Sequence, residues 1–121
     1  MVILIIDDDT DASALLKTFM EQSGFSVIQA YTAQDGVREF ETKRPDAVFL
    51  DILLPDANGL DVLKKLKAGD KITPIVMVTG FKDAENVVQA FRQGAFDCLL
   101  KPYNYDYLKN DILAKITPRA S

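Results

Sequence analysis

Histidine is absent from this chain of 121 residues. Its absence excludes Ser-His-Asp and Cys-His catalysis, the usual histidine metal sites, and a phosphohistidine carried by the chain itself. Any covalent chemistry must therefore run on carboxylates, hydroxyls, lysine side chains or backbone groups.

Cysteine occurs only once, at position 98, so the chain cannot form an internal disulfide. This fits a reducing compartment, and we expect a cytoplasmic protein. Basic residues are fewer than acidic ones, 14 against 18, which gives a net charge of −4 without any basic stripe. A direct nucleic-acid surface is therefore not expected.

Long apolar runs are missing as well, and those present are far too short to span a membrane. Residues 1–6 lack the basic start and the small-residue cleavage site of a signal peptide, so they are expected to form a strand. The length suits one domain with one hydrophobic core. We assign that domain to residues 1–116 and interpret 117–121, which shows no pattern, as a linker stub or frayed tail.

Two hydrophobic periodicities alternate along the chain. Short runs typical of buried parallel strands are separated by patterns typical of amphipathic helices, with apolar residues three or four apart. Gly24 and Gly94 are expected to end the first and fourth helices, and Thr32 to cap the second. Five strand–helix units predict an α/β fold whose parallel sheet is covered on both faces. The predicted strands are residues 2–6, 26–30, 47–50, 74–78 and 97–100, and the apolar helix positions include Leu15, Leu16, Leu63, Val88, Phe91, Leu108, Ile112 and Ile116.

Charged or hydroxyl residues stand at the ends of four of these strands. Three aspartates at 7–9 follow the first strand, Asp51 the third, Thr79 the fourth and Lys101 the fifth. Because parallel strands end at the same edge of a sheet, these groups are expected to meet there.

Each of these residues also has a purely structural interpretation. Asp9 with Thr10 is expected to cap the first helix, Asp51 could be a solvated strand end, and Thr79 and Lys101 could belong to surface loops. Four such residues, each at the carboxyl end of its strand, favour a shared site over four coincidences.

The kinds of group at this edge favour phosphoryl transfer. The carboxylates of Asp7, Asp8 and Asp51 would repel one another, and a divalent cation would relieve that repulsion. Ligands that are all oxygen suit magnesium better than zinc or copper. An ammonium and a hydroxyl would stabilise the equatorial phosphoryl oxygens, and the nucleophile would be a carboxylate.

Four segments together resemble the receiver domain of two-component response regulators. They are ILIIDDD at 3–9, DAVFLDILLPDANGLDVL at 46–63, PIVMVTG at 74–80 and GAFDCLLKPY at 94–103. The resemblance covers essentially the whole chain and is specific in type, order and spacing. It implies a flavodoxin-like, doubly wound sheet of five parallel strands in the order 2-1-3-4-5 with five helices.

The resemblance also implies roles for the groups at the sheet edge. Asp51 would be the phosphoacceptor. The magnesium ligands would be Asp7, Asp8, Asp51 and the backbone carbonyl of Leu53. The groups that contact the phosphoryl oxygens would be Thr79 and Lys101. The turn after the acceptor strand matches the family at Pro55, Asp56 and Gly59, and the bond from Lys101 to Pro102 would be cis.

The function implied is that of a signalling switch. The donor would be a phosphohistidine on a sensor histidine kinase or a phosphotransfer protein. The module would not be an enzyme in the usual sense, although it would catalyse its own phosphorylation and a slow self-dephosphorylation. Family members often continue into an effector domain, and the short tail favours that arrangement here. A homodimer through the fourth helix, fifth strand and fifth helix is a further expectation.

One position departs from the family pattern. The family usually places an aromatic residue, or sometimes histidine, three residues before the lysine, and here that position is Cys98. A thiol is too small to replace a ring that turns inward on activation. Cys98 itself is expected to be a small core residue.

Three other functions are disfavoured by particular residues. A phosphatase of the haloacid dehalogenase type would need a second aspartate two residues after Asp51, where Leu53 stands. A flavin-binding module would need a phosphate loop after the first strand, where the aspartates at 7–9 would repel phosphate. A degenerate receiver that only binds partners is disfavoured because all the site residues are retained.

Two apolar positions generate a prediction about the lifetime of the phosphoryl group. Leu53 and Phe81, two residues after Asp51 and Thr79, cannot orient an attacking water, and hydrolysis needs that water in line with the leaving oxygen. We expect slow self-dephosphorylation, and faster phosphoryl loss in a time course when Leu53 is replaced by Asn and Phe81 by a small polar residue. If neither change speeds the loss, these two side chains do not control the access of water.

Overall fold

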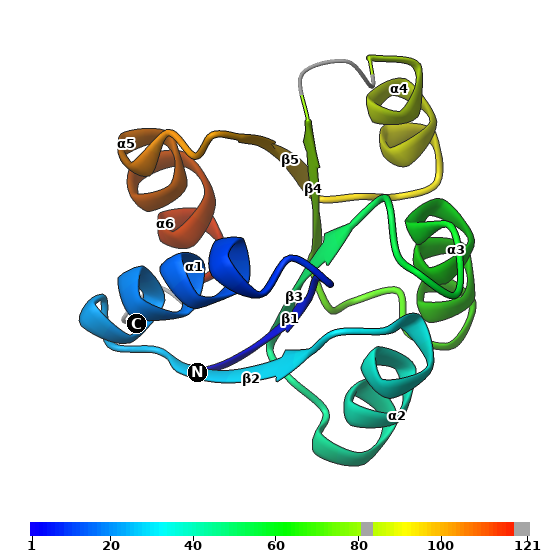
Figure 1. Cartoon of the computed structure of the whole chain (residues 1–121), viewed down its shortest axis with the longest axis horizontal. Coiled ribbons are helices and arrows are strands. Elements are labelled where there is room, and N and C mark those ends of the chain that lie inside the picture. Colours follow the sequence, from blue (N-terminus) through cyan, green and yellow to red (C-terminus); the bar gives the residue numbers. More distant parts are fainter. Residues whose placement is uncertain (81–83, 118–121) are drawn as a thin grey trace.

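The computed structural model describes residues 1–80 and 84–117, and its five strands form one parallel sheet. The strand order is β2-β1-β3-β4-β5, which confirms the doubly wound arrangement (Figure 1). The order reverses between β1 and β3, so a crevice is expected at their carboxyl ends. The strands are β1 (Val2–Ile6), β2 (Ser26–Ala30), β3 (Ala47–Asp51), β4 (Ile75–Gly80) and β5 (Asp97–Lys101).

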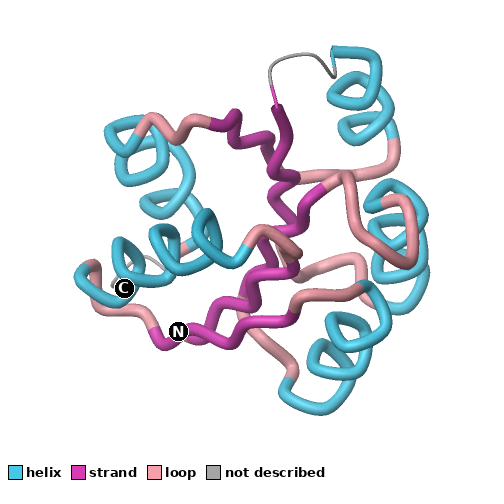
Figure 2. Tube along the Cα trace, in the orientation of Figure 1, coloured by secondary structure: helices cyan, strands magenta, loops and turns pink. Residues whose placement is uncertain are grey.

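Helices cover both faces of the sheet. Figure 2 shows α1 and the carboxyl-terminal helical segments on one face, and α2, α3 and α4 on the other. Among the described residues, no helix is both long enough and apolar enough to cross a membrane. The helices before β5 are α1 (Thr10–Gln22), α2 (Ala33–Lys43), α3 (Gly59–Gly69) and α4 (Ala84–Arg92).

The predicted helix boundaries are confirmed by their capping contacts. The Asp9 side chain accepts a hydrogen bond from a backbone amide of α1, and Thr32 does the same for α2. Each bond satisfies one of the unpaired N–H groups at a helix start, an effect worth about 1 kcal/mol. Gly24 and Gly94 follow α1 and α4 with φ of 95°, a left-handed conformation in which a side chain would be strained.

The last helical region differs from the single helix that the sequence predicted. Residues 105–116 are divided into α5 (Tyr105–Tyr107), the π-helical segment η1 (Leu108–Leu113) and α6 (Ala114–Ile116). Leu108, Ile112 and Ile116 are nevertheless buried, as their spacing predicted. The widened turn therefore leaves the apolar face toward the sheet.

The hydrophobic core lies in two layers, one on each face of the sheet. Leu4 and Ile6 of β1 pack in the layer that contains α2 and α3, whereas Ile3 and Ile5 pack in the layer that contains α1. Because β1 is buried on both faces, its sequence is continuously apolar. Full burial of each such side chain stabilises the fold by roughly 1.5–3 kcal/mol.

Three apolar helix positions are more exposed than their pattern predicted. Leu15 of α1 and Val88 and Phe91 of α4 are 58%, 50% and 48% exposed. Among the described side chains of these helices, the fully buried apolar ones are Leu16, Met20 and Ala90. The apolar pattern of α4 thus extends onto the protein surface.

Candidate functional site

The site is formed where β1, β3 and β5 end. The structure extends β3 and β5 by one residue beyond the prediction, so that Asp51 and Lys101 are the last residues of these strands and Asp7 directly follows β1. The Lys101 Nζ atom lies 3.0 Å from Asp51 Oδ2, to which it donates a hydrogen bond. It also lies 3.0 Å from Asp7 Oδ2, but that contact is an ion pair without hydrogen-bond geometry.

Asp8 completes a group of three carboxylates at this edge. Asp7, Asp8 and Asp51 each offer one oxygen, and these oxygens lie within 4.8 Å of one another. Asp7 is 1% exposed and Asp51 is 8% exposed, whereas Asp8 is exposed to solvent. Two buried carboxylates and one exposed carboxylate therefore converge beside one ammonium.

Backbone amides hold the two buried carboxylates in place. The Asp9 N–H donates to Asp7 Oδ1 at 2.9 Å, and the Leu53 N–H donates to Asp51 Oδ1 at 3.1 Å. Gly59 permits the turn after Asp51, because a Cβ atom there would collide with the backbone of Asp51 and Ile52. The turn therefore packs directly against the strand end that carries the carboxylate.

Burial and charge shift the pKa values of two groups in opposite senses. Burial first, and then the hydrogen bond and charge of Asp51, raise the pKa of Asp7 to about 6. Burial alone would lower the pKa of Lys101, but the carboxylates of Asp51 and Asp7 raise it above its ordinary value. Lys101 is therefore charged at neutral pH, while Asp7 ionises reluctantly.

The residues present fit a hard divalent cation. Three carboxylate oxygens converge, and Asp7 Oδ2 is buried without a hydrogen-bond donor in the described part of the chain. Such cations take oxygen ligands and, in the case of magnesium, keep several waters. The sequence prediction that Asp7, Asp8 and Asp51 lie together is confirmed by this geometry.

Thr79 lies on the neighbouring strand. It is 1% exposed, and its hydroxyl is 3.4 Å from the Gly80 carbonyl. The register pairs Val78 with Asp51, so Thr79 lies one residue beyond the position opposite Asp51 on the adjacent strand. The peptide bond from Lys101 to Pro102 is cis, as the resemblance implied. Leu53 is 65% exposed, and Phe81 lies outside the described residues.

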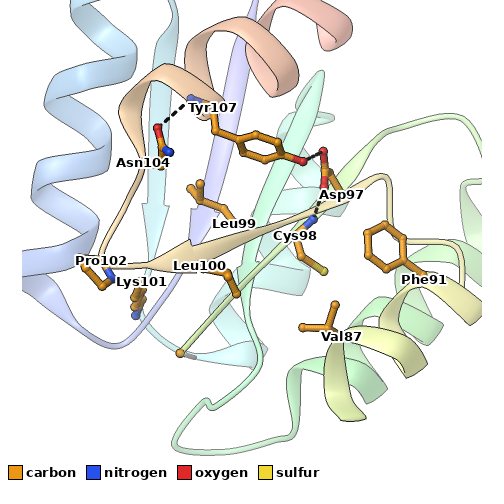
Figure 3. A pocket seen from close by; sticks show the side chains of 11 residues that line it. Val87, Phe91, Asp97, Cys98, Leu99, Leu100, Lys101, Pro102, Asn104 and Tyr107 are labelled. Atoms are coloured by element: carbon orange, nitrogen blue, oxygen red, sulfur yellow. Dashed lines mark hydrogen bonds between the residues drawn. The ribbon is translucent and has the colours of Figure 1, made fainter. Parts of the chain in front are cut away.

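Cys98 borders a pocket that a larger side chain would narrow. The pocket has a volume of about 830 Å³ and lies between α4 and the start of the last helical region, with β5 along it. In Figure 3 the Cys98 side chain points toward Val87 and Phe91 of α4. Burial first, and then Asp97, raise the pKa of Cys98 to about 11, so its thiol is protonated and unreactive at neutral pH.

Two interactions near the site were not predicted from the sequence. The Tyr107 hydroxyl donates to Asp97 Oδ2 at 2.6 Å beside the pocket (Figure 3). The Asp56 carboxylate accepts two backbone N–H groups at the start of α2. The sequence predicts only that Asp56 belongs to a turn. A proline followed by an aspartate does not indicate that the aspartate contacts the start of α2.

A doubly wound parallel sheet with acidic side chains at its carboxyl edge defines a flavodoxin-like α/β protein. The model of the response regulator receiver domain family matches residues 3–113. The chain therefore belongs to the response regulator receiver domain family of two-component systems.

Curated relatives support the same assignment. The chain is 33% identical over 106 residues to the regulatory protein AtoC of Escherichia coli (strain K12), covering 88% of this chain and 23% of AtoC. It is 34% identical over 117 residues to the acid tolerance regulatory protein ActR of Rhizobium meliloti (strain 1021), covering 97% of this chain and 58% of ActR. The chain thus spans only part of the length of these relatives.

Solved structures show the same fold over nearly the whole chain. A CheY-like response regulator receiver domain protein from Methanospirillum hungatei JF-1 has a TM-score of 0.88 at 34% identity, covering 95% of this chain and 92% of that one. A two-component response regulator from Clostridium difficile has a TM-score of 0.88 at 32% identity, covering 94% and 93%.

The crowded carboxylates predict an unusual effect of mutation on stability. Replacing Asp51 by Asn removes one charge that faces Asp7 and Asp8, so in the presence of a chelator the fold should be stabilised by about 1 kcal/mol. Most substitutions of buried residues do the opposite. Thermal unfolding in chelator measures the effect, and a lower melting temperature for Asp51→Asn would show that the charges are not arranged in this way.

The raised pKa of Asp7 predicts how stability without metal depends on pH. The folded-state pKa of about 6 lies above the ordinary 3.8, so the folded state binds the proton more tightly than the unfolded state. This contribution is present below about pH 4 and is lost as the pH rises through 6. In chelator, Asp7→Asn should melt near the wild-type temperature at pH 4 and above it at pH 7. A difference that is independent of pH would contradict the prediction.

Proposed function

We propose that the chain is a phosphoacceptor switch in which Asp51 receives a phosphoryl group from a phosphohistidine on a separate sensor kinase or phosphotransfer protein. The observation that carries the proposal is the position of Lys101 Nζ, 3.0 Å from both Asp7 and Asp51, beside a third carboxylate. These 121 residues contain no histidine, which is consistent with a phosphohistidine donor outside this domain.

In the proposed transfer, a carboxylate oxygen of Asp51 attacks the phosphorus in line with the leaving group. A bond from oxygen to phosphorus forms, the bond from phosphorus to the donor imidazole nitrogen breaks, and the nitrogen keeps the electron pair. Lys101 stays charged throughout and stabilises the phosphoryl oxygens. The Thr79 hydroxyl is proposed to donate to one of the same oxygens from the adjacent strand.

Magnesium is the proposed cofactor, and Asp7, Asp8, Asp51 and the Leu53 carbonyl are its proposed ligands. When bound, the ion would neutralise the charge that develops on the phosphoryl oxygens. Asp7 and Asp51 are already oriented by the amides of Asp9 and Leu53, so little side-chain ordering would be needed for binding. Few protein ligands are offered, which suggests weak binding.

The output is proposed to pass through α4, β5 and the last helical region. Val88 and Phe91 on α4 and Leu100 on β5 are apolar and exposed. Phe91 and Leu100 line the same pocket as Lys101. Phosphorylation would shift the equilibrium between conformations of this surface and so alter its contact with an effector domain, a partner or a second copy. Because Cys98 has no ring to turn, the shift would run through Thr79, Lys101 and the loop after β4, of which residues 81–83 lie outside the described part of the chain.

Transfer from acetyl phosphate tests the proposal without knowledge of the partner kinase. Intact mass measurement should show a gain of one phosphoryl group that requires magnesium and is absent in Asp51→Asn. A phosphatase of the dehalogenase type would instead release phosphate continuously, and a binding-only receiver would show no mass gain. The same mass gain in Asp51→Asn would overturn the assignment of the acceptor.

Asp8 provides a separate prediction, because its side chain is exposed and its loss should leave the fold intact. Asp8→Ala should melt near the wild-type temperature and lose phosphorylation, since removing a ligand weakens metal binding by a factor of ten or more. Asp61→Ala, which removes an exposed carboxylate from α3, is the matched control and should be phosphorylated normally. Wild-type phosphorylation of Asp8→Ala at low magnesium concentration would remove Asp8 from the site.

A further inference from the structure

The loop between β3 and α3 carries the Leu53 carbonyl and is fastened at two places. At its base, Leu53 pairs with Asn58 in an isolated antiparallel bridge, and the Gly59 N–H donates to the Ile52 carbonyl at 2.6 Å. These contacts close the loop on itself. They hold the base of the loop to the end of β3, but they do not connect the loop to α2.

Near the tip of the loop, Asp56 reaches another element. Its Oδ1 accepts from the Ala33 N–H at 2.8 Å, and its Oδ2 accepts from the Gln34 N–H at 3.0 Å. Both amides belong to the first turn of α2, where the loop passes beside the start of that helix (Figure 1). Thr32 already caps the Asp35 N–H, so the two side chains divide the unpaired donors of this turn between them.

The charge of Asp56 suits this position. A carboxylate at a helix start is stabilised by the N–H groups and by the helix dipole. In agreement, the hydrogen bonds from Ala33 and Gln34 lower the pKa of Asp56 below its ordinary value. The carboxylate is therefore ionised, and both of its oxygens are engaged at neutral pH.

The helix that Asp56 holds is itself seated against the first strand. Gly36 in α2 packs so closely on the Ile6 side chain that a Cβ atom at this position would collide with it. Ile6 directly precedes Asp7, and the Asp7 N–H donates to the Ala30 carbonyl at 3.0 Å, just before the segment that enters α2. The start of α2 is thus fixed relative to Asp7.

We propose that Asp56 is a positioning residue: by fastening the loop to the start of α2, it sets where the Leu53 carbonyl and the Leu53 amide lie relative to Asp7. This inference rests on the proposed function, because it assigns Asp56 to the same metal and phosphoryl site. Asp56 does not touch that site. It acts through the closed loop on one side and through α2 on the other.

Magnesium titration followed by amide chemical shifts, at constant ionic strength, tests the inference. Asp56→Ala should raise the dissociation constant for magnesium at least threefold, and Asp56→Asn, which keeps one acceptor oxygen, should have an intermediate effect. Thr32→Ala weakens the same helix start without touching the loop, and Asp61→Ala removes a nearby exposed charge. Both controls should leave the constant within twofold of the wild-type value, although Thr32→Ala should lower the melting temperature.

A dissociation constant for Asp56→Ala within twofold of the wild-type value would overturn the inference. An equal rise in Thr32→Ala or in Asp61→Ala would overturn it too, since the effect would then come from helix stability or from charge. Hydrogen exchange supplies a readout that needs no metal, and the Ala33, Gln34 and Leu53 amides should exchange faster in Asp56→Ala. Absence of magnesium binding by the wild-type protein would overturn the proposed function instead. In that case, hydrogen exchange that is unchanged in Asp56→Ala would show that Asp56 does not hold the loop to α2 either.

Discussion

Like-charge repulsion at the sheet edge is the constraint on which the rest of the site depends. Three carboxylates converge there, and Lys101 lies 3.0 Å from two of them. At an effective dielectric constant of about 20, two unit charges 4 Å apart interact by about 4 kcal/mol, so one ammonium offsets only part of the repulsion. The raised pKa of Asp7 is consistent with the repulsion that remains. A divalent cation bound among these carboxylates would therefore relieve a repulsion that the fold otherwise bears.

The fold bears this repulsion because each charged group ends or follows a strand whose interior is apolar. Burial of β1 and β3 on both faces fixes the strands, and the strands fix the positions of Asp7 and Asp51. Lys101 also lines a pocket that runs along β5. Cys98 borders a pocket of about 830 Å³, and apolar side chains of α4 are half exposed. Lys101 thus belongs both to the acidic edge and to the lining of the pocket between α4 and β5.

Much of this arrangement could be predicted from the sequence because parallel strands bring their carboxyl ends together. Apolar runs that stop at Asp51 and Lys101 were enough to predict the shared edge, and the structure confirms that Asp7, Asp8, Asp51 and Lys101 meet there. The π-helical segment η1 could not be predicted, since Leu108 and Ile112 keep helical spacing in either geometry. Nor could the contact of Asp56 with α2, which depends on the conformation of a loop whose sequence carries no periodicity.

In the proposed function Asp51, and neither Asp7 nor Asp8, carries the phosphoryl group. Borohydride reduces an acyl phosphate to an alcohol, so it marks the modified carboxylate chemically. After phosphorylation with acetyl phosphate and magnesium, reduction and peptide sequencing by mass spectrometry should find homoserine at position 51. Homoserine at position 7 or 8, with Asp51 unchanged, would contradict the account.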